Sequence, residues 1–159
     1  MKRNKLYLVF ALLIAVTFGQ TLSAQSGKEE LDLYQSVFGM QKKAIVAEFL
    51  KVSPDDLFWT LYDEYETARK ELGNQRVKVL EDYAANYSSL TNEQYDVLIG
   101  DMISLRKSTD KLMDTYYKKI KKASGSKVAA QFFQIEAYFV SAIRLTIMEG
   151  IPYIGEFDK

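Results

Sequence analysis

The sequence contains no cysteine and no histidine among its 159 residues. Without cysteine the protein has no disulfide, no thiolate nucleophile and no thiolate ligand for a metal. Without histidine it lacks the usual general base and the commonest metal ligand. Ser/His/Asp catalysis and a Glu-x-x-His di-iron bundle are therefore excluded. No phosphate-binding or dinucleotide-binding glycine motif occurs either. We expect a protein that is not an enzyme, with no catalytic residues, metal site or cofactor.

Proline and glycine are also scarce, with two prolines and eight glycines in the whole chain. An all-β protein needs many tight turns, and these two residues are the strongest turn formers. Their scarcity favours an all-α fold. Hydrophobic residues make up 48% of the chain, which is enough for the core of a single domain.

The formal net charge is zero, with 21 basic and 21 acidic residues. Three of the basic residues, Lys2, Arg3 and Lys5, lie in the first 24 residues, which contain no acid. Removing those three leaves 18 basic against 21 acidic residues, a net charge of −3. Such a chain has no electrostatic reason to bind nucleic acid.

Residues 1–24 have the pattern of a secretory signal peptide. The three basic residues precede a 13-residue apolar run from Leu6 to Phe18, and the small residue Ala24 offers a cleavage point before Gln25. Cleavage after Ser26 is an alternative. The apolar run is shorter than the roughly 20 residues of a membrane-spanning helix. An uncleaved anchor is the other reading, but we expect no stable membrane insertion after the signal is removed.

Apolar residues at helical spacing predict four helices, at about 28–50, 54–87, 92–123 and 126–149, in one domain over 25–159. The two long central helices are expected to form an antiparallel hairpin flanked by the two shorter ones. Folding the chain about residues 88–89 places Leu61 level with Tyr116, and Tyr65 level with Leu112. Gly125 is available for a left-handed conformation at the end of the third helix.

The stretch from Tyr87 to Tyr95 is the predicted corner of this hairpin. Thr91 is expected to cap the following helix and Gln94, three residues later, to bond back to it, which is a capping box. Leu90 occupies the position of a hydrophobic staple. Ser53 is the expected N-cap of the helix at 54–87, with Pro54 at its first position.

Aromatic residues are abundant, with 11 Tyr, nine Phe and one Trp. Tyrosine and tryptophan suit surfaces that bind mixed polar and apolar segments. The candidate binding face comprises Phe58, Trp59, Tyr62, Tyr117, Phe133, Glu136 and Arg144. The alternative is that the aromatic residues form core, and that Glu136 and Arg144 each pair with a neighbouring helix.

The segment Leu90-Thr-Asn-Glu-Gln94 resembles the LTxxQ motif of the Spy/CpxP family of periplasmic proteins. The segments from Leu57 to Tyr65 and from Asp82 to Tyr87 also look like divergent members, so that the resemblance covers about residues 50–150. A second LTxxQ motif is absent, and Val52-Ser-Pro-Asp-Asp56 stands at the comparable helix start.

The resemblance implies a small helical protein of the periplasm, often a cradle-shaped homodimer. It implies an ATP-independent chaperone-like or envelope-stress protein that binds unfolded or partner polypeptides on an apolar, aromatic helical face. The alternative is a regulatory or structural partner of one envelope membrane protein, without general chaperone activity. The net acidic mature chain differs from the basic client surface expected of a Spy-type chaperone.

Overall fold

The computed structural model describes residues 38–87, 89–151 and 153–154. They form a helix over residues 38–50, helix α3 over Phe58–Asn86 and helix α4 over Asn92–Gly150. No strand occurs within these ranges, and the predicted all-α class is confirmed. The signal-peptide prediction and the first ten residues of the helix expected at 28–50 lie outside the described residues.

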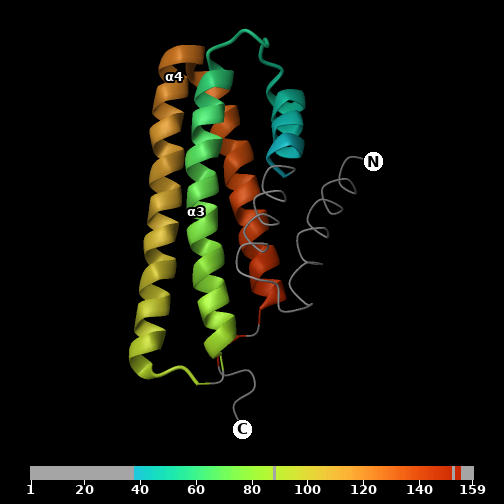
Figure 1. Cartoon of the computed structure of the whole chain (residues 1–159). Coiled ribbons are helices and arrows are strands. Elements are labelled where there is room, and N and C mark those ends of the chain that lie inside the picture. The colour runs from blue at the N-terminus through green and yellow to red at the C-terminus, as the bar shows by residue number, and fades with distance from the viewer. Residues whose placement is uncertain (1–37, 88, 152, 155–159) are drawn as a thin grey trace.

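Helix α4 consists of two arms that meet at Gly125, where the backbone is not helical (φ 89°, ψ 167°). We call residues 92–124 the first arm and residues 126–150 the second arm. Figure 1 shows the chain reversing direction at this point, so that the arms and α3 lie side by side. A positive φ is accessible to glycine at little steric cost, which explains the residue found at the reversal.

Aromatic contacts hold the three long segments together. The Tyr65 ring on α3 lies 5.6 Å from the Tyr116 ring of the first arm and 5.1 Å from the Phe132 ring of the second arm. The sequence predicts Leu61 at the level of Tyr116. In the structure the ring of Tyr116 packs instead on Tyr65, which lies one helical turn after Leu61 on α3. The helix of residues 38–50 covers the same upper part of the bundle (Figure 1).

Helix α3 begins at Phe58 rather than at residue 54, and the prediction that Ser53 caps it is wrong. No side chain makes a capping bond at the N-cap position, Leu57. The carbonyl of Ser53 accepts instead from the backbone N–H of Asp56 at 3.1 Å, which closes a turn ahead of the helix. The carboxylate of Asp56 then accepts the N–H of Phe58 at 2.8 Å, a bond that Ser53 is too far back in the chain to make.

The capping box predicted at the start of α4 is present. The hydroxyl of Thr91 accepts from the N–H of Gln94 at 3.3 Å, and the side-chain carbonyl of Gln94 accepts from the N–H of Thr91 at 2.8 Å. Two N–H groups that an isolated helix start would leave without partners are satisfied in this way.

The core lies toward the end of the bundle where α3 begins, on the inward faces of the helix of residues 38–50, α3 and both arms of α4. Its buried residues are Val46, Leu50, Phe58, Tyr62, Tyr65, Met113, Tyr116, Ile120, Ala129, Phe132, Phe139 and Val140. Helical spacing on the helix of residues 38–50 is compatible with a stripe through Gln41, Ile45 and Phe49, but the inward positions differ from it. Gln41 and Phe49 are exposed, and the buried residues recur every fourth position as Phe38, Lys42, Val46 and Leu50.

Candidate functional site

The candidate binding face predicted from the sequence is not a single exposed surface. Phe58, Tyr62 and Glu136 are completely buried, so the prediction that they lie on an exposed binding face is wrong. Phe58 and Tyr62 stack at 5.5 Å, and Phe132 of the second arm meets both rings edge-on. The physical reason is that the second arm and the helix of residues 38–50 both pack on the start of α3, which leaves its aromatic face no access to solvent.

The remaining residues of that predicted face lie nearer the surface but do not converge. Trp59 is partly buried and donates from Nε1 to the carbonyl of Ser53 at 3.0 Å. Tyr117 meets Phe133 edge-on at 6.0 Å, and Phe133 is 43% exposed. Arg144 lies further along the second arm, with Nη2 3.5 Å from Oδ1 of Asp110.

Glu136 belongs to a buried ion cluster that also contains Lys42, Glu66 and Arg69. Nζ of Lys42 donates to Oε2 of Glu136 and to Oε1 of Glu66, both at 2.6 Å. Arg69 donates from Nε and Nη2 to the two carboxylate oxygens of Glu66, at 2.9 and 3.0 Å. Two positive and two negative charges therefore balance, and the cluster connects the helix of residues 38–50 with α3 and the second arm.

Two tyrosines complete the surroundings of Glu136. Tyr65 donates its hydroxyl to Oε2 at 2.8 Å, and Tyr62 donates to Oε1 at 3.3 Å. The rings of Tyr65 and Phe139 also lie 5.4 and 5.2 Å from the ammonium of Lys42, within cation–π range. The carboxylate and the ammonium are thus supplied with partners from the protein itself. This arrangement supports a structural role for Glu136, the alternative reading of its charge.

The two carboxylates bound to Lys42 titrate in opposite directions. Burial raises the pKa of Glu136, and its single cationic partner, Lys42, only partly offsets that effect. Burial also acts to raise the pKa of Glu66, but the positive charges of Lys42 and Arg69 prevail and hold it below its ordinary value. Burial together with the charge of Glu136 raises the pKa of both Tyr62 and Tyr65, so these tyrosines remain neutral donors.

Sequence reasoning identified Glu136 but missed its partner Lys42 and the neighbouring pair Glu66 and Arg69. The clearest missed signal concerns Lys42. A signal was available, because Phe38, Lys42 and Val46 are four residues apart and share one helical face. A lysine between two apolar residues on that face indicates either an ammonium group that extends to water or a buried ion pair with a carboxylate. The sequence pointed to a polar residue on the second arm, Glu136, but not to its partner.

A groove of about 280 Å³ lies at the opposite end of the bundle, where α3 ends and α4 begins. From α3 it is lined by Val79, Asp82, Tyr83 and Asn86. From the connection and the first arm it is lined by Leu90, Glu93, Gln94, Val97, Leu98 and Asp101. Leu90 and Gln94 of the LTxxQ segment thus form part of its wall, in addition to their place at the helix start.

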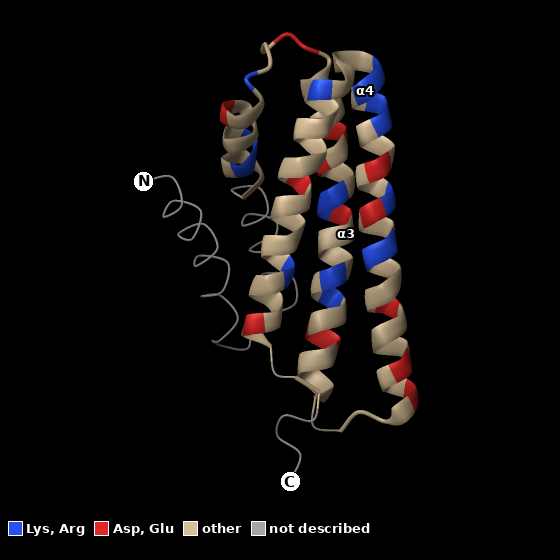
Figure 2. Cartoon of the chain, turned by 180° about the vertical axis from the view of Figure 1, so that it is seen from behind, with Lys and Arg blue, Asp and Glu red and all other residues tan. Residues whose placement is uncertain are grey.

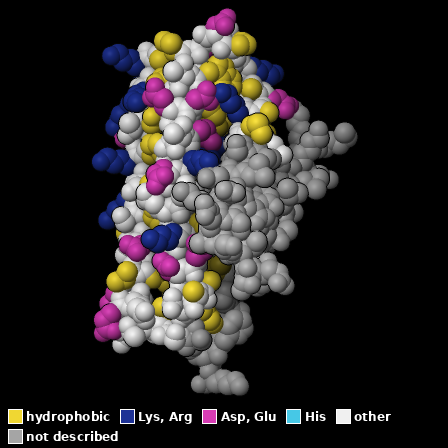
Figure 3. Space-filling model, viewed as in Figure 1, with side chains coloured by type: hydrophobic (Ala, Val, Ile, Leu, Met, Phe, Trp, Pro, Cys, Tyr) yellow, Lys and Arg dark blue, Asp and Glu magenta, His cyan; other side chains and the backbone are white. Residues whose placement is uncertain are grey.

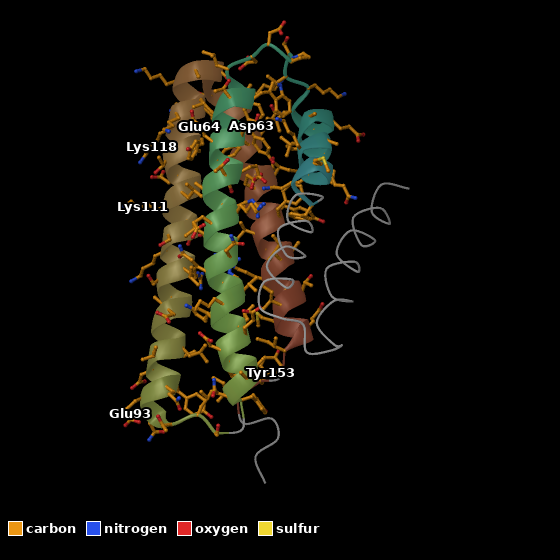
Figure 4. The ribbon with its side chains drawn as sticks, viewed as in Figure 1. Asp63, Glu64, Glu93, Lys111, Lys118 and Tyr153 are labelled. Atoms are coloured by element: carbon orange, nitrogen blue, oxygen red, sulfur yellow. The ribbon has the colours of Figure 1, made fainter. Side chains whose placement is uncertain are left out.

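The groove combines an apolar interior with an acidic edge. Val97 is 63% exposed, while Tyr83 is buried against the groove floor. The charged lining residues are all acidic, namely Asp82, Glu93 and Asp101. Figure 4 places Glu93 at the lower end of the molecule, far from Asp63 and Glu64 near the start of α3. Figure 3 shows hydrophobic and acidic side chains mixed at that lower end.

Charge is distributed unevenly along the first arm. Residues 92–105 include Glu93, Asp96 and Asp101 and no basic residue, whereas residues 106–124 carry seven Lys or Arg and two Asp. Figure 2 shows this division along α4, with only acidic residues at the lower end and most of the basic ones above. The groove therefore lies in the acidic end of the molecule.

Two searches within the described part of the chain were negative. It contains no group of three or more acidic side chains arranged to hold a metal ion. Among its helices none has the length and apolar character needed to cross a membrane. Comparison of the sequence and structure with protein-family models, curated proteins and solved structures found no significant match.

Proposed function

We propose that the protein binds polypeptide segments that are both apolar and basic, in the groove between the end of α3 and the start of α4. The observation that carries this proposal is the combination of an apolar lining, in which Val97 is exposed, with an edge whose charges are all negative. Apolar contacts supply affinity and the acidic edge selects the partner's charge. In this proposal α3 and the first arm act as an antiparallel helical hairpin that presents the groove.

The resemblance of Leu90-Thr-Asn-Glu-Gln94 to the LTxxQ motif supports a more specific form of the proposal. The protein is then a periplasmic, ATP-independent chaperone-like or envelope-stress protein of the Spy/CpxP type, without enzymatic activity. The motif and the groove coincide in Leu90 and Gln94. A groove that accepts many unfolded chains needs an apolar lining, and this groove has one.

The acidic edge also favours a second candidate function. A regulatory or structural protein that binds one envelope membrane protein needs selectivity more than breadth, and three carboxylates around a small groove select against acidic and neutral segments. An aggregation-suppression assay with several unrelated unfolded proteins separates the two functions. Suppression of most of them favours the chaperone-like function, and suppression of none favours the dedicated partner.

The central experiment measures binding of three labelled peptides of equal length by fluorescence anisotropy. One peptide is apolar and basic, one apolar and neutral, and one apolar and acidic. We expect the basic peptide to bind at least about tenfold more tightly than the acidic one, and the difference to shrink at high salt. Equal binding of the basic and acidic peptides would contradict the proposal.

Two matched variants locate the binding surface. Val97→Lys places a positive charge in the groove, and Leu145→Lys places the same charge at a similarly exposed apolar residue on the second arm, outside it. We expect the first substitution to weaken binding of the basic, apolar peptide and the second to leave it unchanged. A loss of binding only in Leu145→Lys would place the surface on the second arm instead.

We also propose a homodimer. Tyr138, Leu145 and Met148 are each more than half exposed on the second arm, and their spacing of seven and three residues places them on one helical face. Such a stripe suits the helix of a second copy. Sedimentation equilibrium of wild type and Leu145→Asp tests this. The wild type should be dimeric and the variant should dissociate, whereas a monomeric wild type contradicts the proposal.

Export is the last element of the proposal. We expect the intact mass of the exported protein to correspond to a chain that starts at Gln25 or, with the alternative cleavage, at Gly27. A membrane-bound species that retains Met1 to Ala24 would contradict export as a mature periplasmic protein.

A further inference from the structure

Arg76 and Arg144 meet at the middle of the bundle, on a site that the groove and the ion cluster do not include. Arg76 comes from α3, and its Nη2 lies 3.4 Å from Oγ1 of Thr109 on the first arm. Arg144 comes from the second arm, and its Nη2 lies 3.5 Å from Oδ1 of Asp110, the residue after Thr109. Three helical segments therefore bring two guanidinium groups to adjacent residues of one arm.

The hydrogen bonding of these two arginines is incomplete. Nη2 of Arg144 is buried and has no hydrogen-bond partner in the described part of the protein, because Asp110 is placed for charge attraction only. The contact of Arg76 with Thr109 is long for a hydrogen bond. The Thr109 hydroxyl already donates to the carbonyl of Leu105 at 2.8 Å, so it accepts from Arg76 but offers no further donor. Buried donors without acceptors are rare in native proteins.

The local charge is also unbalanced. Within the described residues two guanidinium groups face one carboxylate, Asp110, and Asp110 is 57% exposed, so water screens its charge. Burial lowers the pKa of Arg76, and the positive charges of Arg144 and Arg69 lower it further. Arg69 pairs with Glu66, so its repulsion of Arg76 is the smaller of the two. An added anion would relieve both the repulsion and the missing hydrogen bonds.

We infer that Arg76 and Arg144 form a binding site for a phosphate group. A guanidinium presents its N–H donors in a fixed fork that matches the oxygens of a phosphate. The oxygens of a tetrahedral anion can accept hydrogen bonds from two guanidinium groups that approach from different helices. A single carboxylate does so less well, and the distance between Arg144 and Asp110 is accordingly long, at 3.5 Å. The Arg144 side chain is 33% exposed although its Nη2 is buried, so the site borders on solvent. The phosphate is either free or part of a small phosphomonoester.

The test is thermal unfolding and isothermal titration calorimetry with inorganic phosphate, against chloride at the same ionic strength. At a phosphate concentration about ten times the dissociation constant, we expect the unfolding midpoint of the wild type to rise by roughly 2–5 °C. Arg76→Met and Arg144→Met should each abolish the rise. Arg106→Met, at an exposed position on the first arm, is the matched control and should retain it.

A second measurement separates a binding role from a purely structural one. In phosphate-free buffer, Arg144→Met should be as stable as the wild type or more stable, since it removes the repulsion of Arg76 and a buried donor without a partner. If Arg144→Met is less stable without phosphate, or if either methionine variant keeps the full rise, the inference is wrong. The same holds if phosphate and chloride have equal effects on the wild type. Should Arg144→Met fail to fold, Arg76→Met decides the test alone.

Glycerol 3-phosphate identifies the source of the phosphate group. Tighter binding than inorganic phosphate supports the site and a phosphomonoester as its ligand, and weaker binding supports the site and free phosphate. This experiment is independent of the proposed groove, because Val97→Lys leaves the arginine site untouched and should keep the full response to phosphate.

Discussion

Lys42 and Glu136 are separated by 94 positions in the sequence, yet their charged atoms lie 2.6 Å apart and both side chains are buried. The pair joins the helix of residues 38–50 to the second arm of α4. Glu66 and Arg69 of α3 extend it into a cluster that touches three of the helical segments. The cluster has a clear physical consequence, because a buried charge that loses its partner is far more costly than an exposed one.

We therefore expect Lys42→Met to destabilise the protein by about 3–5 kcal/mol, since it leaves Glu136 buried without a cation. The double variant Lys42→Met/Glu136→Gln should recover part of that loss, because glutamine is neutral and still accepts from Tyr65. Lys43→Met is the control. Lys43 pairs with Asp63 at the surface, and its loss should cost no more than about 1 kcal/mol. Urea unfolding measures the stability of all three variants. Equal losses of stability in Lys42→Met and Lys43→Met would show that the buried ion pair matters no more than the exposed one.

The opposite pKa shifts of Glu66 and Glu136 predict opposite pH dependences. The lowered pKa of Glu66 contributes stability that is present above its ordinary value of 4.5 and is lost as the pH falls through the lowered value. The raised pKa of Glu136 contributes stability that is present below 4.5 and is lost as the pH rises through the raised value. The measurement is the free energy of unfolding as a function of pH.

In that measurement Glu66→Gln should reduce the loss of stability in acid, and Glu136→Gln should reduce the decline as the pH rises above 4.5. Glu64→Gln removes an exposed carboxylate from the same helix and serves as the control. If the free energy of unfolding falls as steeply in acid for Glu66→Gln as for the wild type, the lowered pKa of Glu66 does not explain the loss of stability.

The capping box predicts how α4 responds to changes at Thr91. Thr91→Ala should cost about 0.5–2 kcal/mol, the usual range for the loss of a threonine cap, and Thr91→Ser should be nearly silent because serine keeps the acceptor. Thr115→Ala is the control. Thr115 is exposed within the helix, and its hydroxyl bonds only to the carbonyl of Lys111. If Thr91→Ser abolishes peptide binding at unchanged stability, the threonine methyl group contacts the ligand and capping is not its main role.

The reversal between the arms depends on the backbone of Gly125. An alanine Cβ there would meet no atom within 4 Å, so any cost of Gly125→Ala comes from the positive φ of 89°. We expect a loss of about 1–3 kcal/mol. Gly100→Ala is the matched control, because Gly100 is helical and equally open. That substitution should stabilise α4 by about 0.5–1 kcal/mol. Thermal or urea unfolding of both variants is sufficient, and equal effects would contradict the backbone explanation.

Local features of the sequence determined much of the fold. The absence of cysteine and histidine and the scarcity of proline and glycine indicated an all-helical protein without the usual catalytic groups. The capping box at Thr91 and the reversal at Gly125 were predictable, because each depends on residues within a few positions of one another. The sequence predicts the start of α3 four residues too early. In the structure a turn from Ser53 to Asp56 provides hydrogen bonds for the backbone N–H groups of Asp56 and Phe58, so the helix begins only after it.

Only the tertiary structure decided which faces of the helices are inside. The stripe through Gln41 and Phe49 and the inward face through Lys42 and Val46 are both compatible with helical periodicity, and the second one is buried because Glu66 and Glu136 lie opposite Lys42. The aromatic face at Phe58 and Tyr62 was expected at the surface and is core, since the second arm packs on it. Burial depends on which segments meet across many positions of the chain, and neither spacing nor local capping contains that information.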